Sequence, residues 1–342
     1  MSLPTQTPDP TTLFSARGLV VAITGGGTGI GLSIATALHR TSARAIYLLG
    51  RRESVLTAAA TSLDPTLTTA IPLVCDINSL ASIRSAVARV ERDHGYLDVL
   101  VNNAGREGPH TKAAFEAQTV EELQKILLNG FVDDGPSRAG EEEKEEEEEE
   151  EAFKETLFTN AATVVSVSAS FLHLLDAGNR RRGWQGGRVA DNAVRPRTLP
   201  AEGSGVDEGD LRTSQIISVA SIAAFNRYSV GGLAYGASKA AATHLGKMLA
   251  TLLVPWGVRC NVVAPGVYPS AMTAAYPQSF PVSQIPAGRQ GTPDEIAAAV
   301  LYLVGKGGAY VNGAVQLTDE GETRNSKDGS AVSRVPSDCG PF

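Results

Sequence analysis

The stretch Val20-Val21-Ala22-Ile23-Thr24-Gly25-Gly26-Gly27-Thr28-Gly29-Ile30-Gly31 places an apolar strand directly before a glycine-rich turn and the start of a helix. Backbone without a Cβ atom lets a pyrophosphate approach closely, and the free N–H groups at a helix start bind its oxygens. Ile30, Ile34 and Leu38 recur every four residues and predict an apolar helix face that packs on a sheet. The stretch predicts a dinucleotide site, although a tight strand-to-helix connection without a ligand fits it too.

Short apolar runs alternate with helical patterns through the first third of the chain. This alternation predicts an α/β fold with a parallel sheet and helices on both of its faces. The strand-like runs are 19–23, 45–49, 71–75, 97–101, 215–219, 258–264 and 314–317. The helical patterns are 30–40, 53–62, 80–92, 153–175, 233–253 and a helix that begins after an N-cap at Thr292.

The net charge of −7 comes from one run, 141–151, which holds ten glutamates and one lysine. The rest of the chain carries +2, which gives no reason to expect nucleic acid or a strongly charged partner. Like charges repel and bury no apolar surface, so the run predicts disorder rather than docking. Cys75, Cys260 and Cys339 lack CxxC spacing, which argues against disulfides and a metal site and fits a reducing compartment.

No segment has the pattern of a targeting sequence or of a membrane span. Residues 1–17 are polar and contain prolines, and the apolar stretch 161–175 is interrupted by three serines and His173. A membrane helix needs about 18 consecutive apolar residues. We therefore expect a cytoplasmic protein that does not enter a membrane, with flexible tails at 1–17 and 322–342.

Polar residues follow the predicted strands, at the edge of a parallel sheet where ligands bind. Arg51 lies 20 residues after Gly31, where an NAD site would carry an acid for the ribose 2′-hydroxyl, so the arginine favours a 2′-phosphate. A solvated arginine pair at a strand end is the alternative. Asp76, after the third strand, is placed to accept from an adenine amino group. The fourth strand is followed by Asn102, Asn103, Ala104 and Gly105.

These motifs, with a later Tyr235-xxx-Lys239 pair, resemble the short-chain dehydrogenase/reductase family over residues 18–321, apart from two insertions. The motifs also stand in that family's order. The resemblance implies a single Rossmann-type domain with a seven-stranded parallel sheet in the order 3-2-1-4-5-6-7. It also implies cofactor contacts by Thr24, Gly25, Thr28, Gly29, Ile30, Gly31, Arg51, Asp76, Asn103, Ala104, Gly105, Tyr235, Lys239, Pro265, Gly266, Val267 and Ser270.

Tyr235 and Lys239 lie one helical turn apart, an arrangement suited to acid–base chemistry. An ordinary phenol has a pKa of ~10, and a nearby ammonium is expected to lower the pKa of the phenol. A chance pair on an amphipathic helix is the alternative. The resemblance implies that Ser221 orients the substrate carbonyl, Tyr235 donates a proton, Lys239 holds the nicotinamide ribose and Asn160 holds a relay water. Ser218, in mid-strand, is an alternative to Ser221.

Two insertions interrupt the family pattern. The first, about 106–152, contains a capping-box sequence before Leu123 and then the glutamate run. The second, 178–213, is rich in arginine, glycine and proline and predicts a flexible surface loop. We expect the basic loop and the glutamate run to attract each other at low salt. A nucleic-acid role for the arginines is disfavoured because only Trp184 offers an aromatic platform for a base.

The resemblance predicts an NADP(H)-dependent reductase of a ketone or 3-oxoacyl-type carbonyl. The stretches 265–273 and 285–291 look most like those of 3-oxoacyl-carrier-protein reductases. An NAD-dependent alcohol dehydrogenase that works oxidatively and a non-catalytic nucleotide-binding scaffold are the alternatives.

Three apolar residues and two helices bear on substrate and assembly. Met272, Tyr276 and Phe280 fit either a mobile lid over an apolar substrate or ordinary core contacts. The family resemblance implies a homodimer or homotetramer formed through the helices at 153–175 and 233–253. The expected ligand is a small-molecule carbonyl or alcohol.

Overall fold

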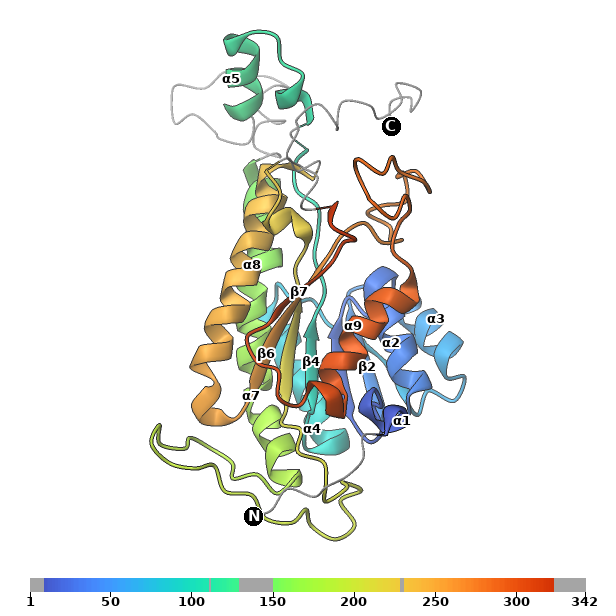
Figure 1. Ribbon diagram of the computed structural model, residues 1–342, viewed down its shortest axis with the longest axis vertical. Helices are drawn as coiled ribbons and strands as arrows, with labels where there is room; N and C mark the ends of the chain where they lie inside the picture. The colour runs from blue at the N-terminus through green and yellow to red at the C-terminus, as the bar shows by residue number, and fades with distance from the viewer. Residues whose placement is uncertain (1–8, 111, 129–149, 228–230, 323–342) are drawn as a thin grey trace.

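The computed structural model describes residues 9–110, 112–128, 150–227 and 231–322, and its strands form one seven-stranded sheet (Figure 1). All strands are parallel and run in the order β3-β2-β1-β4-β5-β6-β7. The prediction of a single Rossmann-type sheet in this order is therefore confirmed. The strands are β1 Val20–Thr24, β2 Ala45–Gly50, β3 Ala70–Val74, β4 Val99–Asn102, β5 Gln215–Val219, β6 Arg259–Pro265 and β7 Val315–Thr318.

Helices cover both faces of the sheet. One face packs against α2, α3 and α9, and the other packs against α4, α7 and α8 (Figure 1). The α-helices are α1 Pro10–Leu13, α2 Gly29–Arg40, α3 Glu53–Leu63, α4 Leu80–His94, α5 Val120–Leu128, α7 Thr163–Arg181, α8 Gly232–Leu252 and α9 Pro293–Val304. The shorter turns are 3₁₀ turns at Lys112–Phe115, Ile222–Ala224, Val254–Trp256 and Lys306–Gly308 and a π turn at Phe158–Ala162.

The central strands are apolar throughout because both of their faces are covered. In β1, Val21 and Ile23 pack toward α2 and α9, whereas Val20 and Ala22 pack toward α4 and α7. All five residues of β1 are buried. Successive side chains of a strand point to opposite faces, so a strand buried on both sides needs an unbroken apolar run. The apolar run before the glycine turn therefore forms the centre of the sheet.

Local signals fix several helix ends as predicted. Thr292 caps α9, because its hydroxyl accepts from the Glu295 N–H at 3.3 Å and the Glu295 carboxylate accepts from the Thr292 N–H at 2.7 Å. Pro293 occupies the first position of that helix. In the first insertion, the Thr119 hydroxyl accepts from the Glu122 N–H at 3.1 Å, at the start of the predicted helix α5. These contacts satisfy donors that a helix start leaves free.

The predicted helix at 153–175 is longer than expected. It runs from Glu150 to Arg181 and contains the π turn, which the sequence pattern did not indicate. Within the described residues, this helix is long and apolar enough to cross a membrane. Half of its most apolar 18-residue segment, however, is buried inside the protein. Val167, Phe171 and Leu174 pack on the sheet. Its apolar character is thus accounted for by the core of the fold.

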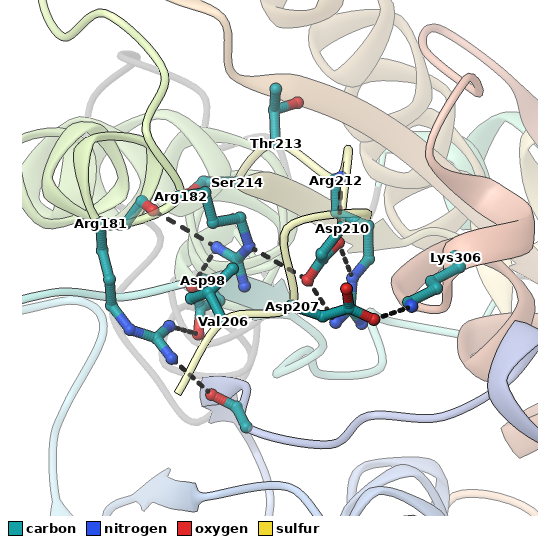
Figure 2. A network of polar contacts seen from close by, with 12 residues as sticks. Asp98, Arg181, Arg182, Val206, Asp207, Asp210, Arg212, Thr213, Ser214 and Lys306 are labelled. Atoms are coloured by element: carbon teal, nitrogen blue, oxygen red, sulfur yellow. Dashed lines mark hydrogen bonds and ion pairs between the residues drawn. The ribbon is translucent and has the colours of Figure 1, made fainter. Parts of the chain in front are cut away.

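The second insertion is attached to the amino-terminal edge of the sheet (Figure 2). Arg182, only 2 % exposed, pairs with Asp98, which is 1 % exposed and lies just before β4. At the far end of the insertion, Arg212 and Asp210 pair at 2.8 Å and are both buried. The prediction of a flexible surface loop is wrong for these two ends. Buried carboxylates neutralise the charges of these two arginines. The number of basic residues in the sequence does not reveal this pairing.

Parts of the first insertion and of the tails lie outside the described residues, namely 1–8, 111, 129–149 and 323–342. The expectations for residues 141–149 of the glutamate run, including its attraction to the basic loop, fall there, whereas Glu150 and Glu151 begin the long helix that ends at Arg181. Residues 9–17, predicted as flexible, are attached: α1 forms at Pro10–Leu13, and the Ala16 N–H donates to the Thr41 carbonyl at 3.2 Å. Ala16 is fully buried, which explains the attachment.

Candidate active site

The glycine turn between β1 and α2 is packed so tightly that side chains do not fit. A Cβ atom on Gly31 would lie 2.2 Å from the carbonyl oxygen of Gly25, and one on Gly25 would lie 3.0 Å from the Ala104 Cα atom. Gly25 and Gly29 have φ values of +65° and +50°, which glycine adopts easily. The turn therefore brings bare backbone and the start of α2 to the carboxyl edge of the sheet, as a pyrophosphate site requires.

Thr24 and Asn103 hold the turn against the end of β4. The Thr24 hydroxyl accepts from the Asn103 N–H at 2.9 Å and from the Ala104 N–H at 3.0 Å. The Asn103 side-chain amide donates to the Thr24 carbonyl at 2.9 Å. Thr24 is buried behind the turn, whereas Asn103 also lines the cleft in front of it. The structure thus places Thr24, predicted among the cofactor contacts, as a support for that loop.

A cleft of about 370 Å³ runs along the carboxyl edge, across the point where the strand order reverses between β1 and β4. This is where open α/β sheets bind their ligands. The predicted cofactor contacts that line it are Gly25, Thr28, Gly29, Ile30, Arg51, Asp76, Asn103, Ala104, Gly105, Tyr235, Lys239 and Ser270. The chain was expected to hold a dinucleotide here, and the bare-backbone turn and this elongated lining fit one.

The remaining predicted cofactor residues lie beside or beneath the cleft. Gly31 packs under the turn. Pro265 ends β6, and a Cβ atom on Gly266 would lie 3.0 Å from the Asp319 Cα atom. Val267 lines a second cavity, of about 780 Å³, formed with the end of β7 and the segment after it. Its N–H donates to the Glu322 carboxylate, whose pKa is raised to about 7, chiefly by burial.

One end of the cleft carries the two charged residues that the sequence singled out. Arg51 follows β2 and is exposed, and Arg52 next to it also lines the cleft. Asp76 follows β3, where one of its carboxylate oxygens accepts from the Asn78 N–H at 3.0 Å. No described residue donates to the other oxygen of that carboxylate, which leaves it for a donor on a ligand. Both residues thus lie on the cleft at the carboxyl ends of neighbouring strands.

Ser221, Tyr235 and Lys239 come together at the opposite end of the cleft. The Ser221 hydroxyl forms a hydrogen bond with the Tyr235 phenol and accepts from the Ala223 N–H at 3.1 Å. The Lys239 ammonium donates to the Val219 carbonyl at 3.2 Å and lies 5.7 Å from the centroid of the Tyr235 ring. One turn of α8 separates the tyrosine and the lysine, so both side chains face the end of β5.

The pKa of the phenol moves in the direction opposite to the one predicted. Burial raises the pKa of Tyr235 to about 12, and the hydrogen bond from Ser221 opposes this rise. Burial also lowers the pKa of Lys239 to about 8. Desolvation of the phenol and of the ammonium therefore shifts their pKa values more than the attraction between phenolate and ammonium that their spacing predicts. As a consequence, the phenol keeps its proton at neutral pH.

Asn160 lies in the π turn, and both the oxygen and the nitrogen of its side-chain amide form hydrogen bonds. Its Oδ1 atom accepts from the Arg106 N–H at 2.8 Å, and its Nδ2 atom donates at 2.9 Å to the Arg106 carbonyl and to the Ser238 hydroxyl. A Cβ atom on Gly105 would lie 3.0 Å from Asn160 Oδ1 and 3.3 Å from Lys239 Nζ. The amide oxygen and the ammonium therefore adjoin the same glycine.

The choices left open by the sequence have structural answers. Ser218 is buried in the middle of β5, whereas Ser221 follows the strand and contacts the phenol. Phe280 is buried, with its N–H bonded to the Gly288 carbonyl at 2.9 Å, which fits core packing. Met272 lines the cleft, and Tyr276 is half-buried. Only part of the expected lid therefore lies on the cleft.

Comparisons with known proteins agree with this geometry. The short chain dehydrogenase family profile matches residues 19–133, and a profile described as enoyl-(acyl carrier protein) reductase matches residues 207–323. The chain is 36 % identical to the short-chain dehydrogenase/reductase PhomF of Diaporthe leptostromiformis, over 91 % of this chain and 93 % of that protein. It is 30 % identical to the rhamnolipids biosynthesis 3-oxoacyl-[acyl-carrier-protein] reductase of Pseudomonas aeruginosa, over 90 % and 97 %.

A solved structure, the Pseudomonas aeruginosa RhlG/NADP active-site complex, superposes with a TM-score of 0.65 at 26 % identity, covering 91 % of this chain and 99 % of that one. The fold and the cleft together define an oxidoreductase of the Rossmann type. The chain belongs to the short-chain dehydrogenase/reductase family.

Proposed function

We propose that this protein reduces a ketone or 3-oxoacyl-type carbonyl to a secondary alcohol with NADP(H). The observation that carries the proposal is the hydrogen bond between Ser221 and Tyr235 beside Lys239, at one end of the dinucleotide cleft. The related 3-oxoacyl-[acyl-carrier-protein] reductase, at 30 % identity, supports a carbonyl substrate of this type.

The chain's own residues divide the work of the reaction. A bound dihydronicotinamide supplies the hydride. Ser221 binds the carbonyl oxygen and orients it toward the phenol. Tyr235 donates its proton as negative charge develops on that oxygen, and a phenol with a pKa of about 12 is protonated and ready at neutral pH. The raised pKa makes the same phenol a poor base at neutral pH.

Lys239 and Asn160 support the proton donor. The Lys239 ammonium, held by the Val219 carbonyl, is placed to bind the nicotinamide ribose. Asn160, whose amide is anchored to Arg106 and Ser238, is placed to hold a water that passes protons toward the lysine. These roles follow the family resemblance, and the position of Asn160 Oδ1 and Lys239 Nζ on the same side of Gly105 supports them.

The catalytic proposal is tested by NADPH oxidation with a panel of ketones and 3-oxo esters. Substitution Tyr235→Phe removes the proton donor and is expected to lower kcat about 10²–10⁴-fold while NADPH binding is retained. Activity that survives this substitution would remove the mechanism. Binding of NADPH without turnover of any substrate would favour a nucleotide-binding scaffold.

NADP(H) is proposed over NAD(H) because Arg51 lies on the cleft at the end of β2. The RhlG complex, which contains NADP, supports the same choice. A charged hydrogen bond contributes about 1.5–3 kcal/mol, so Arg51→Ala is expected to weaken NADPH binding about 10–100-fold and to leave NADH binding nearly unchanged. Equal losses for both cofactors would favour the NAD-dependent alcohol dehydrogenase.

We also propose a cytoplasmic homodimer or homotetramer that contacts neither nucleic acid nor membrane. Exposed apolar side chains on α8, including Met248 and Leu252, support assembly through the α7 and α8 surface. Sedimentation at micromolar concentration tests the assembly, and a monomer would refute it.

A further inference from the structure

Two hydrogen bonds link the loop after β3 to the π turn in the long helix. The Asn78 side-chain amide donates to the Thr159 hydroxyl at 3.1 Å, and that hydroxyl donates to the Asn78 amide oxygen at 3.2 Å. Both residues line the dinucleotide cleft, although they stand 81 positions apart in the sequence. The paired contact therefore joins two distant segments at the wall of the cleft.

The loop side of this link lies at the end of the cleft where Arg51 is proposed to bind the 2′-phosphate, and thus the adenosine half, of NADP(H). The Asn78 N–H donates to the Asp76 carboxylate at 3.0 Å, which closes a tight turn. Asn78 is exposed, and it lines the cleft together with Asp76 and Arg51. A nucleotide bound against these residues would shield the Asn78 amide from water.

The helix side of the link adjoins the proposed catalytic centre. Thr159 is 8 % exposed and directly precedes Asn160 in the π turn. The Asn160 amide bonds to the Arg106 backbone and to the Ser238 hydroxyl. A π turn is a rare interruption of an α-helix, so its shape depends on the contacts that its side chains make. The contacts of Thr159 on one side and of Asn160 on the other therefore determine where the Asn160 amide lies.

We propose that Asn78 is a positioning residue that couples binding of the adenosine half to turnover, because it holds, through Thr159, the π turn that carries Asn160. This inference rests on the proposed reductase function. Water competes for the hydrogen bonds of an exposed amide, and exclusion of water strengthens them. A bound adenosine half therefore fixes the turn more firmly, and turnover is faster with the whole dinucleotide than with its nicotinamide half.

The test compares two hydride donors, NADPH and reduced nicotinamide mononucleotide, which lacks the adenosine half. The turnover number kcat is measured with each donor at saturation and with the best ketone or 3-oxo ester of the panel. Asn78→Ala and Thr159→Val each remove the link, and each is expected to lower kcat with NADPH about 10-fold, since one or two hydrogen bonds are lost. With the mononucleotide, kcat is expected to change little, because no adenosine half is present to strengthen the link.

Three further variants separate this role from a general loss of stability. Thr159→Ser keeps the hydroxyl and is expected to retain most of the ratio of kcat between the two donors. Thr36→Val is the matched control, because its hydroxyl donates to the Leu32 carbonyl at 2.8 Å within α2, and it is expected to leave that ratio unchanged. The double variant Asn78→Ala with Thr159→Val is expected to lower the ratio no further than either change alone, since both remove the same link.

The link is also followed without turnover, by hydrogen exchange of the backbone amides of Phe158–Ala162. Saturating NADPH, confirmed by its fluorescence, is expected to slow this exchange in wild type and to slow it less in Asn78→Ala. Unchanged kcat in the variants, or equal losses with both donors, would overturn the inference, as would equal protection of the turn in the two proteins. Protection that depends on Asn78 in a protein that reduces no carbonyl compound would refute the proposed reductase activity and leave the link standing.

Discussion

The buried pair between Asp98 and Arg182 predicts a large loss of stability when its acid is removed. Asp98 is 1 % exposed and pairs with Arg182 (Figure 2). It also accepts from the Val20 N–H at 2.7 Å. Asp98→Asn keeps the shape of the side chain but leaves a guanidinium that is 2 % exposed without its main counter-charge. Arg182 then keeps its ion pair with Asp210 at 3.7 Å and its hydrogen bond to the Gly178 carbonyl at 3.4 Å.

Removing one partner of a buried ion pair costs about 3–5 kcal/mol, a large share of the ~5–15 kcal/mol that stabilises a folded domain. For a domain of this size we expect the midpoint of thermal unfolding to fall by about 5–8 °C. The free energy of unfolding is measured by urea denaturation followed by circular dichroism. The urea midpoints of wild type and variant are compared when the slope of this free energy against urea concentration is the same for both.

Asp207→Asn is the matched control, because Asp207 pairs with Lys306 at 2.8 Å but its side chain is 64 % exposed. An exposed pair contributes at most about 1 kcal/mol. A double variant, Asp98→Leu with Arg182→Met, is expected to lose less stability than Asp98→Asn alone, since Arg182 is no longer charged and Asp210 keeps its pair with Arg212. If Asp98→Asn and Asp207→Asn had equal, small effects, the reasoning about the buried pair would be refuted.

Three further perturbations follow from the fold and the site. Gly31→Ala places a Cβ atom 2.2 Å from the Gly25 carbonyl and is expected to weaken NADPH binding at least about 10-fold; unchanged binding, measured by fluorescence, would contradict the assigned turn geometry. Lys239 has a pKa lowered to about 8, so its ammonium is present below that pH and is lost above it. NADPH affinity should therefore fall between pH 7 and 9.5 in wild type but not in Lys239→Arg, and parallel profiles would argue against ribose binding by Lys239. Phe171→Ala, at a fully buried position, is expected to cost about 3–5 kcal/mol in urea denaturation, and a loss below 1 kcal/mol would show that α7 repacks without a cavity.

Much of the fold was predictable because local patterns specify it. The sequence signals for the glycine turn, the unbroken apolar strands and the Thr292 cap each lie within a few consecutive residues. The strand order followed from the resemblance, since local patterns do not determine which strands pair. The π turn at Phe158–Ala162 gave no local signal, yet it carries Asn160.

The parts of the site that were not predictable depend on contacts between distant segments. The first insertion approaches Tyr235 at Gly108, and spacing along the chain does not indicate this. The direction of the phenol pKa was predicted wrongly because the pattern shows the neighbouring lysine but not the desolvation of both groups. Arg182 was assigned to solvent because its partner Asp98 lies 84 positions away.

The anchoring of the second insertion at both of its ends has a consequence for protease digestion. Arg182 and Arg212 fasten the two sides of this segment to the body, while Leu199 between them is 64 % exposed. A protease that cuts the chain once near this leucine would therefore yield two fragments that stay associated under native conditions. The nicked protein would separate into these fragments only on a denaturing gel.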